Sequence, residues 1–190
     1  IKDQQLSCWS FFLAIDIIIL MNLGFIGTGQ IAKAVIKGIL VSNIKYSKIF
    51  ISKRNSKISS QLSRNSKKIT IIKNNQDIIN KSDWVFLAVT PKVGNKIIKK
   101  LSFKKKQIIV SFISTIKMLD LKRYIKVKAT IVRAIPLPPI SLRKGPVPIF
   151  PPNKKVKNFF DKLGTTIEIK NENSSLNFWA TSSVMAPFYE

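Results

Sequence analysis

The chain has 190 residues, 45% of them hydrophobic, so it can bury one well-packed core and the start of a second. It contains one cysteine and no histidine, which excludes a disulfide framework, a Cys/His metal site and a histidine-based catalytic triad, and which fits a reducing compartment such as the cytoplasm. The formal net charge of +24 would suit a polyanion, but the lysines are scattered between isoleucine-rich runs without a nucleic-acid-binding motif, so we expect neither a metal nor a nucleic acid as a partner.

The first 20 residues differ from the rest of the chain. Residues 8–20 are strongly apolar but are interrupted by Asp16, and they are fewer than the ~20 residues of a membrane span. They have neither the basic run nor the small-residue cleavage site of a signal peptide. Because Met21 directly precedes the first predicted strand, we interpret residues 1–20 as upstream sequence outside the native protein. A membrane anchor is the alternative.

From Met21 onward, short apolar runs alternate with amphipathic segments, which predicts strands connected by helices. We expect strands at 23–26, 48–52, 68–72, 84–89, 107–112 and 128–135, and helices at 30–42, 57–64, 76–80, 93–101 and 118–124. This alternation implies right-handed crossovers and a doubly wound, mostly parallel sheet of the α/β class.

The pattern changes after residue 135. Seven of the nine prolines stand at positions 136, 138, 139, 146, 148, 151 and 152. Because proline cannot donate a hydrogen bond to a sheet, we expect a stiff extended loop with at most an edge strand near 147–150. A helix at 154–163, a strand at 165–169 and a helix from Asn173 onward should follow.

The glycine-rich stretch between the first strand and the first helix carries the clearest functional signal. Gly27 and Gly29 end the apolar run, and Ala32 follows three residues later. In Rossmann-type domains such residues make the tight turn, let the backbone approach a pyrophosphate and let the helix pack closely on the strand. The start of the helix then offers free N–H groups to the anion. We therefore predict a dinucleotide site at Gly27, Thr28, Gly29, Gln30 and Ile31, the alternative being an ordinary tight turn.

The end of the second predicted strand indicates which dinucleotide is bound. NAD-binding proteins place an acid about 20 residues after the glycines, where it bonds the ribose 2′-hydroxyl. Here the chain reads Ser52-Lys53-Arg54-Asn55, without an acid. Arg54 can bind a 2′-phosphate through two parallel hydrogen bonds, with Ser52 and Asn55 donating beside it. We therefore predict NADP(H) rather than NAD(H); the alternative is a solvated basic turn.

The order of these motifs resembles that of the pyrroline-5-carboxylate reductase family. The matching stretches are GFIGTGQIA at the glycine turn, residues 52–55, Asn75, DWVFLAVTP (83–91), IIVSFIS (108–114) and VRAIP (132–136). The resemblance implies a Rossmann domain over 21–170 that binds NADPH, followed by an all-helical dimerisation domain that would begin at 171–190. It also implies reduction of the cyclic C=N of 1-pyrroline-5-carboxylate to proline, in proline biosynthesis, by a homodimer or larger oligomer.

The resemblance also assigns residues to the cofactor by position. It places Asn75 near the adenosine ribose, Ser111 and Ser114 near the nicotinamide, and four consecutive residues along the nicotinamide ribose: Ala88, Val89, Thr90 and Pro91.

The half of the sequence that would hold the substrate departs from the family. Thr90 stands where the family usually has lysine, and Pro136-Leu137-Pro138-Pro139 replaces the usual Pro-Asn-Thr-Pro, which removes two polar side chains. The usual Gly-Ser-Gly-Pro appears within Ser182-Ser183-Val184-Met185-Ala186-Pro187. We therefore expect a divergent, C-terminally truncated relative whose substrate can differ and which is inactive as this fragment alone.

Hydride transfer from nicotinamide C4 to a C=N carbon requires little from the protein, because the cofactor carries the difficult step. No catalytic side chain is assigned. Ser182 and Ser183, placed where a new helix would begin, are candidates for binding the substrate carboxylate, with helix capping as the alternative. Trp84 and Phe86 are expected in the core, whereas Trp179 and Phe188 would form a docking face for further helices or ordinary interdomain packing.

Three functions therefore stay open. The first is an NADPH-dependent reductase of a cyclic imine or a related carbonyl compound. The second is a non-catalytic NADP-binding regulatory module, which the lost polar pair favours. The third is another NADP-dependent oxidoreductase on the same scaffold, such as a deazaflavin-dependent NADP reductase or a hydroxyacid dehydrogenase.

Overall fold

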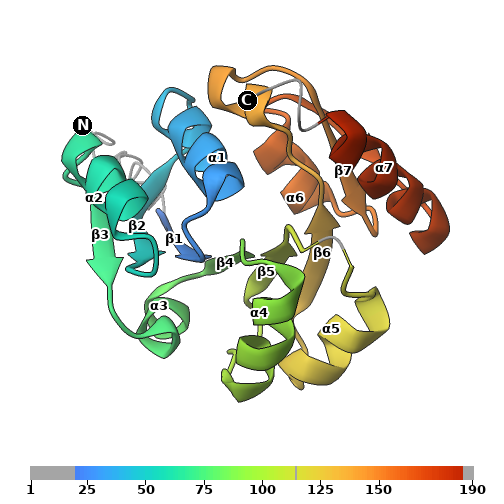
Figure 1. The fold of residues 1–190 in the computed structure, drawn as a ribbon, viewed down its shortest axis with the longest axis horizontal. Helices are drawn as coiled ribbons and strands as arrows, with labels where there is room; N and C mark the ends of the chain where they lie inside the picture. The colour runs from blue at the N-terminus through green and yellow to red at the C-terminus, as the bar shows by residue number, and fades with distance from the viewer. Residues whose placement is uncertain (1–19, 114, 186–190) are drawn as a thin grey trace, which may run out of the picture.

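A computed structural model describes residues 20–113 and 115–185, with the backbone alone for Trp179 and 181–185 (Figure 1). Apart from Leu20, the residues interpreted as an extension (1–20) lie outside the described residues, as do Ser114, Phe188 and the side chain of Trp179, for which expectations were given.

Eight strands form a single sheet in the order β3-β2-β1-β4-β5-β6-β7-β8. The strands are β1 (Met21–Ile26), β2 (Tyr46–Ser52), β3 (Ile69–Ile72), β4 (Trp84–Leu87), β5 (Ile108–Ser111), β6 (Thr130–Ala134), β7 (Pro146–Phe150) and β8 (Thr165–Glu168). The first six are mutually parallel, with the chain crossing from β3 back to β4 beside β1. The Rossmann-type α/β fold predicted from the alternating pattern is thus confirmed.

Helices connect the strands and cover both faces of the sheet (Figure 1). They are α1 (Gln30–Leu40), α2 (Ser56–Asn65), α3 (Asn75–Lys81), α4 (Pro91–Ile97), α5 (Met118–Ile125), α6 (Lys154–Phe160) and α7 (Glu172–Met185), with the 3₁₀ helices η1 (Ile98–Lys100) and η2 (Pro138–Leu142). Most elements lie within a few residues of their expected positions. After β8, the described residues contain α7 alone, so a complete helical domain is not evident in them.

The core lies on the two faces of the sheet. On the face covered by α1 and α6, Phe25 stacks on Phe86 with ring centroids 4.5 Å apart, and Trp84 stacks on Phe159 at 4.8 Å. A second apolar cluster fills the space between the sheet and α3, η1 and α5. Trp84 and Phe86 are therefore core residues, as the sequence predicted. No helix in the described ranges is long and apolar enough to cross a membrane.

The proline-rich segment differs from the expectation of an extended loop with an edge strand. Part of it forms η2, and β7 lies inside the sheet, antiparallel to β6 and parallel to β8. Pro148 O accepts a hydrogen bond from Ile135 N (2.9 Å), whereas Ile149 O accepts from Ile169 N beside β8 (2.9 Å). Because N–H and C=O of a strand residue point to the same side, the missing N–H groups of Pro146 and Pro148 face the side where β6 has already ended at Ala134. An interior strand can therefore include both prolines.

Candidate functional site: the glycine turn and the carboxyl ends of β1, β2 and β4

The turn after β1 requires glycine at one position and leaves open space at another. Gly27 has φ +100°, and a Cβ added there would lie 2.3 Å from Ala88 O, so both backbone conformation and close approach demand glycine. At Gly29 an added Cβ would meet nothing within 4 Å. Gly29 is the N-cap of α1, which has no side-chain cap and no acid in its first turn. The start of α1 therefore presents its N–H groups to an open space, as an anion site requires.

Ser52 holds the glycine turn against the end of β2. Gly27 N donates to Ser52 Oγ (2.9 Å), and Thr28 Oγ1 donates to Ser52 O (3.3 Å). Asn55 N donates in turn to Thr28 Oγ1 (3.4 Å). Ser52 is buried and is not among the residues that line the cavity described below, so its place beside a 2′-phosphate stays a prediction. Its hydroxyl holds the turn because it accepts the hydrogen bond of the Gly27 N–H.

A cavity of about 450 Å³ opens over this turn. Its walls come from the glycine turn, from the start of α2 and from the segment between β4 and α4; the lining residues are Gly27, Thr28, Gly29, Arg54, Asn55, Ser56, Lys57, Ala88, Val89 and Thr90. Eight of the predicted cofactor residues are thus brought together at the carboxyl edge of the sheet, next to the β1–β4 crossover where Rossmann-type folds bind ligands.

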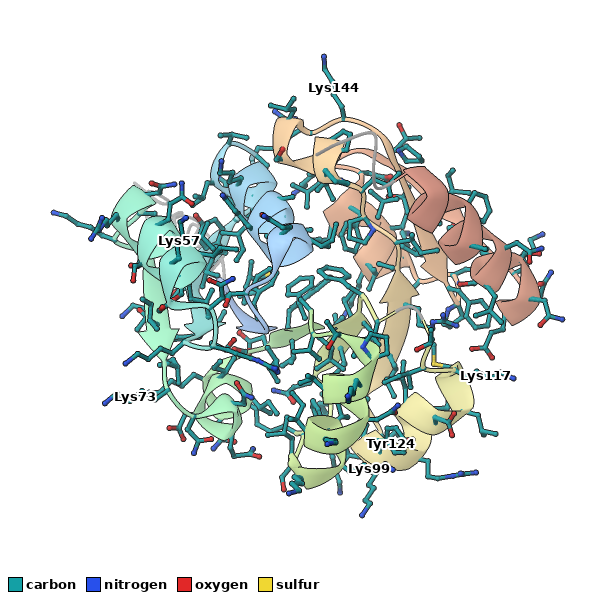
Figure 2. All side chains as sticks on the ribbon, in the orientation of Figure 1. Lys57, Lys73, Lys99, Lys117, Tyr124 and Lys144 are labelled. Carbon is teal, nitrogen blue, oxygen red and sulfur yellow. The ribbon has the colours of Figure 1, made fainter. Side chains whose placement is uncertain are left out.

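The charge around this cavity has one sign. Arg54 and Lys57 both line it and are exposed, and the described lining residues include no acid. Figure 2 shows Lys57 on α2, and its other labelled lysines lie on separate sides of the molecule. The cavity therefore combines two exposed cationic side chains with the positive end of α1, which is an arrangement suited to a ligand with several phosphates.

Sequence reasoning missed Ser56 and Lys57 as cavity residues. The signal lay in Asn55, whose Oδ1 accepts from Ile58 N and so caps α2. An N-cap at this position puts the next two residues in the first turn of α2, at the carboxyl end of β2. Because Asn55 Oδ1 caps α2, Asn55 N donates to Thr28 Oγ1 and Asn55 O accepts from Ser59 N (2.9 Å), the side-chain NH₂ is the group that this residue can offer to a ligand.

Other predicted cofactor residues lie outside the cavity wall. Gln30 and Ile31 are in the first turn of α1, Asn75 is the first residue of α3, and Pro91 is the first residue of α4. Ser111 ends β5 fully buried, where its Oγ accepts from Ile113 N (3.3 Å).

The expectation for Ser182 and Ser183 is wrong in one respect. A helix does not begin there, because both residues lie in the last turns of α7, which starts at Glu172. Within a helix their N–H groups are used by carbonyls one turn earlier, so they are not available to bind a carboxylate.

The segment after β6 packs on α1. Gly38 allows this contact, since a Cβ there would lie 2.4 Å from Ile140 O in η2. Leu137, Pro138 and Pro139 are half-buried in this segment and bring no polar side chain to the carboxyl edge of the sheet. In the part of the chain that is described, no group of three or more potential metal ligands occurs.

Comparisons with known proteins agree with this geometry. Residues 22–115 match the family described as NADP oxidoreductase, coenzyme F420-dependent. Pyrroline-5-carboxylate reductase 3 of Danio rerio is 30% identical over 129 residues, which are 66% of this chain and 44% of the relative. The chain thus spans less than half of the length of this curated relative.

Solved structures show the same fold. The 1-pyrroline-5-carboxylate reductase of Streptococcus pyogenes has a TM-score of 0.72 at 23% identity, covering 90% of this chain and 66% of the other. The pyrroline carboxylate reductase of Plasmodium falciparum, solved with NADP bound, has a TM-score of 0.70 at 20% identity over 89% and 64% of the two chains. The resemblance predicted from the motifs is thus confirmed: residues 22–115 are similar to a family of NADP oxidoreductases, 129 residues are similar to a pyrroline-5-carboxylate reductase, and the solved structures show the same Rossmann-type fold.

Proposed function

We propose that the chain is the cofactor-binding part of an NADPH-dependent reductase that acts on a cyclic imine of the 1-pyrroline-5-carboxylate type. The observation that carries this proposal is the cavity over Gly29, which has two cations, an uncapped helix start and no acid among its described lining residues. The related reductases supply the reaction class.

The residues present fit a dinucleotide phosphate. A Cβ at Gly29 would project into the open space beside the start of α1, so glycine there leaves room for a pyrophosphate against the backbone. Arg54 would hold a 2′-phosphate together with Lys57, which lies two residues after Asn55, the N-cap of α2. Ala88, Val89 and Thr90 would pass the nicotinamide ribose along the opposite wall.

When bound, NADPH supplies the hydride, so the protein needs to orient the two reactants rather than provide a strong acid or base. The chain contributes the rigid turn at Gly27 and the neutral wall at residues 88–90. We propose the cytoplasm as its location, a homodimer or larger assembly formed through further helices, and a small-molecule imine rather than nucleic acid as its partner.

A second candidate is an NADP-binding module without catalysis. The observation that favours it is the segment after β6, where Leu137 and two prolines are packed beside α1 and offer no polar side chain to a substrate. This module would share the cofactor site and differ in the absence of turnover.

Two measurements on the whole protein test these candidates. Binding of NADPH and NADH is measured by nicotinamide fluorescence, and NADPH consumption is then followed with 1-pyrroline-5-carboxylate and with other cyclic imines. The reductase predicts tighter binding of NADPH than of NADH and consumption with at least one imine. NADPH binding without consumption would favour the module, and no preference for NADPH would overturn the assignment of the cavity.

A further inference from the structure

Arg133 is a fully buried charge on β6. Its side chain is 0% exposed, and its Nη1 donates to Glu172 Oε1 at 2.9 Å. Burial lowers the pKa of the Arg133 guanidinium, and the neighbouring Glu172 carboxylate acts in the opposite direction. A buried arginine is rare and costly, so the position of its partner is strongly constrained.

Glu172 also caps the N-terminus of α5, a helix that is distant in sequence. Its Oε1 accepts from Met118 N at 2.6 Å, at the start of α5. The N-cap of α5 is Lys117, which makes no side-chain cap of its own. Glu172, the first residue of α7, therefore provides α5 with a carboxylate at its positive end, across 54 positions of sequence.

This contact lies at the carboxyl edge of the sheet, on the side away from Arg54. Arg133 pairs in register with Ser111, which in turn pairs with Leu87 at the end of β4. The N-terminus that Glu172 caps therefore lies a few residues after the end of β5 at Ser111. In open α/β sheets, ligands lie outside these strand ends.

We propose that Glu172 is a positioning residue: by binding Arg133 and the N-terminus of α5 together, it fixes the start of α5 beside the carboxyl end of β5, where the nicotinamide half of the cofactor would lie under the proposed function, and so couples the placement of α7 to cofactor geometry. This inference rests on the proposed function for its ligand. Its geometry, a three-way junction of β6, α5 and α7, stands on the contacts alone.

The experiment compares a ligand that contains the nicotinamide half of the cofactor with one that lacks it. Affinities for NADPH and for adenosine 2′,5′-bisphosphate, which has no nicotinamide, are measured on the unmodified chain and on Glu172→Gln. The matched control is Glu168→Gln, which removes the same charge from an exposed residue of β8. Amide hydrogen exchange at residues 118–121 reports directly on the cap.

We expect Glu172→Gln to weaken NADPH binding by about five- to tenfold, a typical coupling between sites, while the affinity for the bisphosphate stays unchanged. Exchange at Met118 and the next residues should accelerate in this variant and not in Glu168→Gln. If Glu172→Gln does not fold, Glu172→Asp is used instead, because it keeps the charge on a shorter side chain. We expect it to weaken NADPH binding more than bisphosphate binding, by a smaller factor than Glu172→Gln.

The inference is overturned if both ligands bind to the unmodified chain and Glu172→Gln weakens them equally or not at all. That result would leave the cofactor site intact. Failure of the unmodified chain to bind either ligand would instead remove the proposed function and this inference with it.

Discussion

The two ends of the carboxyl edge of the sheet are assembled in different ways. At β1 and β2 the cavity depends on contacts between residues about 25 positions apart, such as Gly27 N with Ser52 Oγ. At β5 and β6 the edge depends on Glu172, which reaches back 39 positions to Arg133 and 54 to Met118. The first end is built mainly within one βαβ unit, to which residues 88–90 after β4 add a wall, and the second requires α7, which starts 54 positions after Met118. The adenosine side should therefore tolerate changes in α7 that the nicotinamide side does not.

The largest expected effect comes from the glycine turn at the first end. Gly27→Ala forces a non-glycine residue into φ +100° and against Ala88 O, which we expect to destabilise the fold by about 2 kcal/mol or more and to abolish NADPH binding. Thermal unfolding and nicotinamide fluorescence measure both effects.

Gly29→Ala is the matched control for that substitution. Its Cβ meets no atom of the described residues within 4 Å, so the free energy of unfolding should fall by no more than about 1 kcal/mol, the cost of alanine at an N-cap, while cofactor binding weakens. Equal destabilisation by both substitutions would show that the turn, and not the open space beside it, explains the second glycine.

A smaller effect is expected at the hydrogen bond that holds the turn. Ser52→Ala leaves the buried Gly27 N without its acceptor, which should cost about 1–3 kcal/mol of unfolding free energy. Chemical denaturation measures this loss. Ser102→Ala, at an exposed position, should change stability little, and a similar loss in both variants would contradict the role given to Ser52.

The smallest expected effect concerns α7, beside the carboxyl ends of β5 and β6. Ser175 lies one turn after Glu172 on α7, is 1% exposed, and its Oγ has no hydrogen-bond partner among the described residues. Ser175→Ala should therefore be neutral or stabilise the chain by up to about 1 kcal/mol, because a buried unpaired hydroxyl is removed. A clear loss of stability in denaturation would reveal that this hydroxyl is used.

The sequence predicted the first end better than the second for a physical reason. Strand, glycine turn and helix follow one another along the chain, so the missing side chains at Gly27 and Gly29 are visible in a short window. The Arg133–Glu172 junction has no local pattern, since neither residue's neighbours reveal that the two meet. The cap at Asn55 is intermediate: it is local, but only the structure shows that it brings Lys57 to the cavity.

The same reason explains the corrections to the fold. Prolines in β7 were expected to exclude an interior strand, but their missing N–H groups face the side where β6 ends, which depends on long-range register. Ser182 and Ser183 were expected at a helix start, but α7 begins ten residues before Ser182, at Glu172. In front of it, Asn171 Oδ1 accepts from Ser174 N at 2.8 Å.

The central claim is that Arg54 and Lys57, the two cations beside the glycine turn, select NADP(H). It is tested most directly by measuring the affinities for NADPH and NADH before and after Arg54→Asp, with Lys73→Asp, at an exposed position outside the cavity wall, as the charge-matched control. We predict that the unmodified chain prefers NADPH and that Arg54→Asp weakens NADPH at least about tenfold more than NADH, as expected for loss of a charge-assisted phosphate contact. Equal weakening of the two cofactors, or none, would contradict the account.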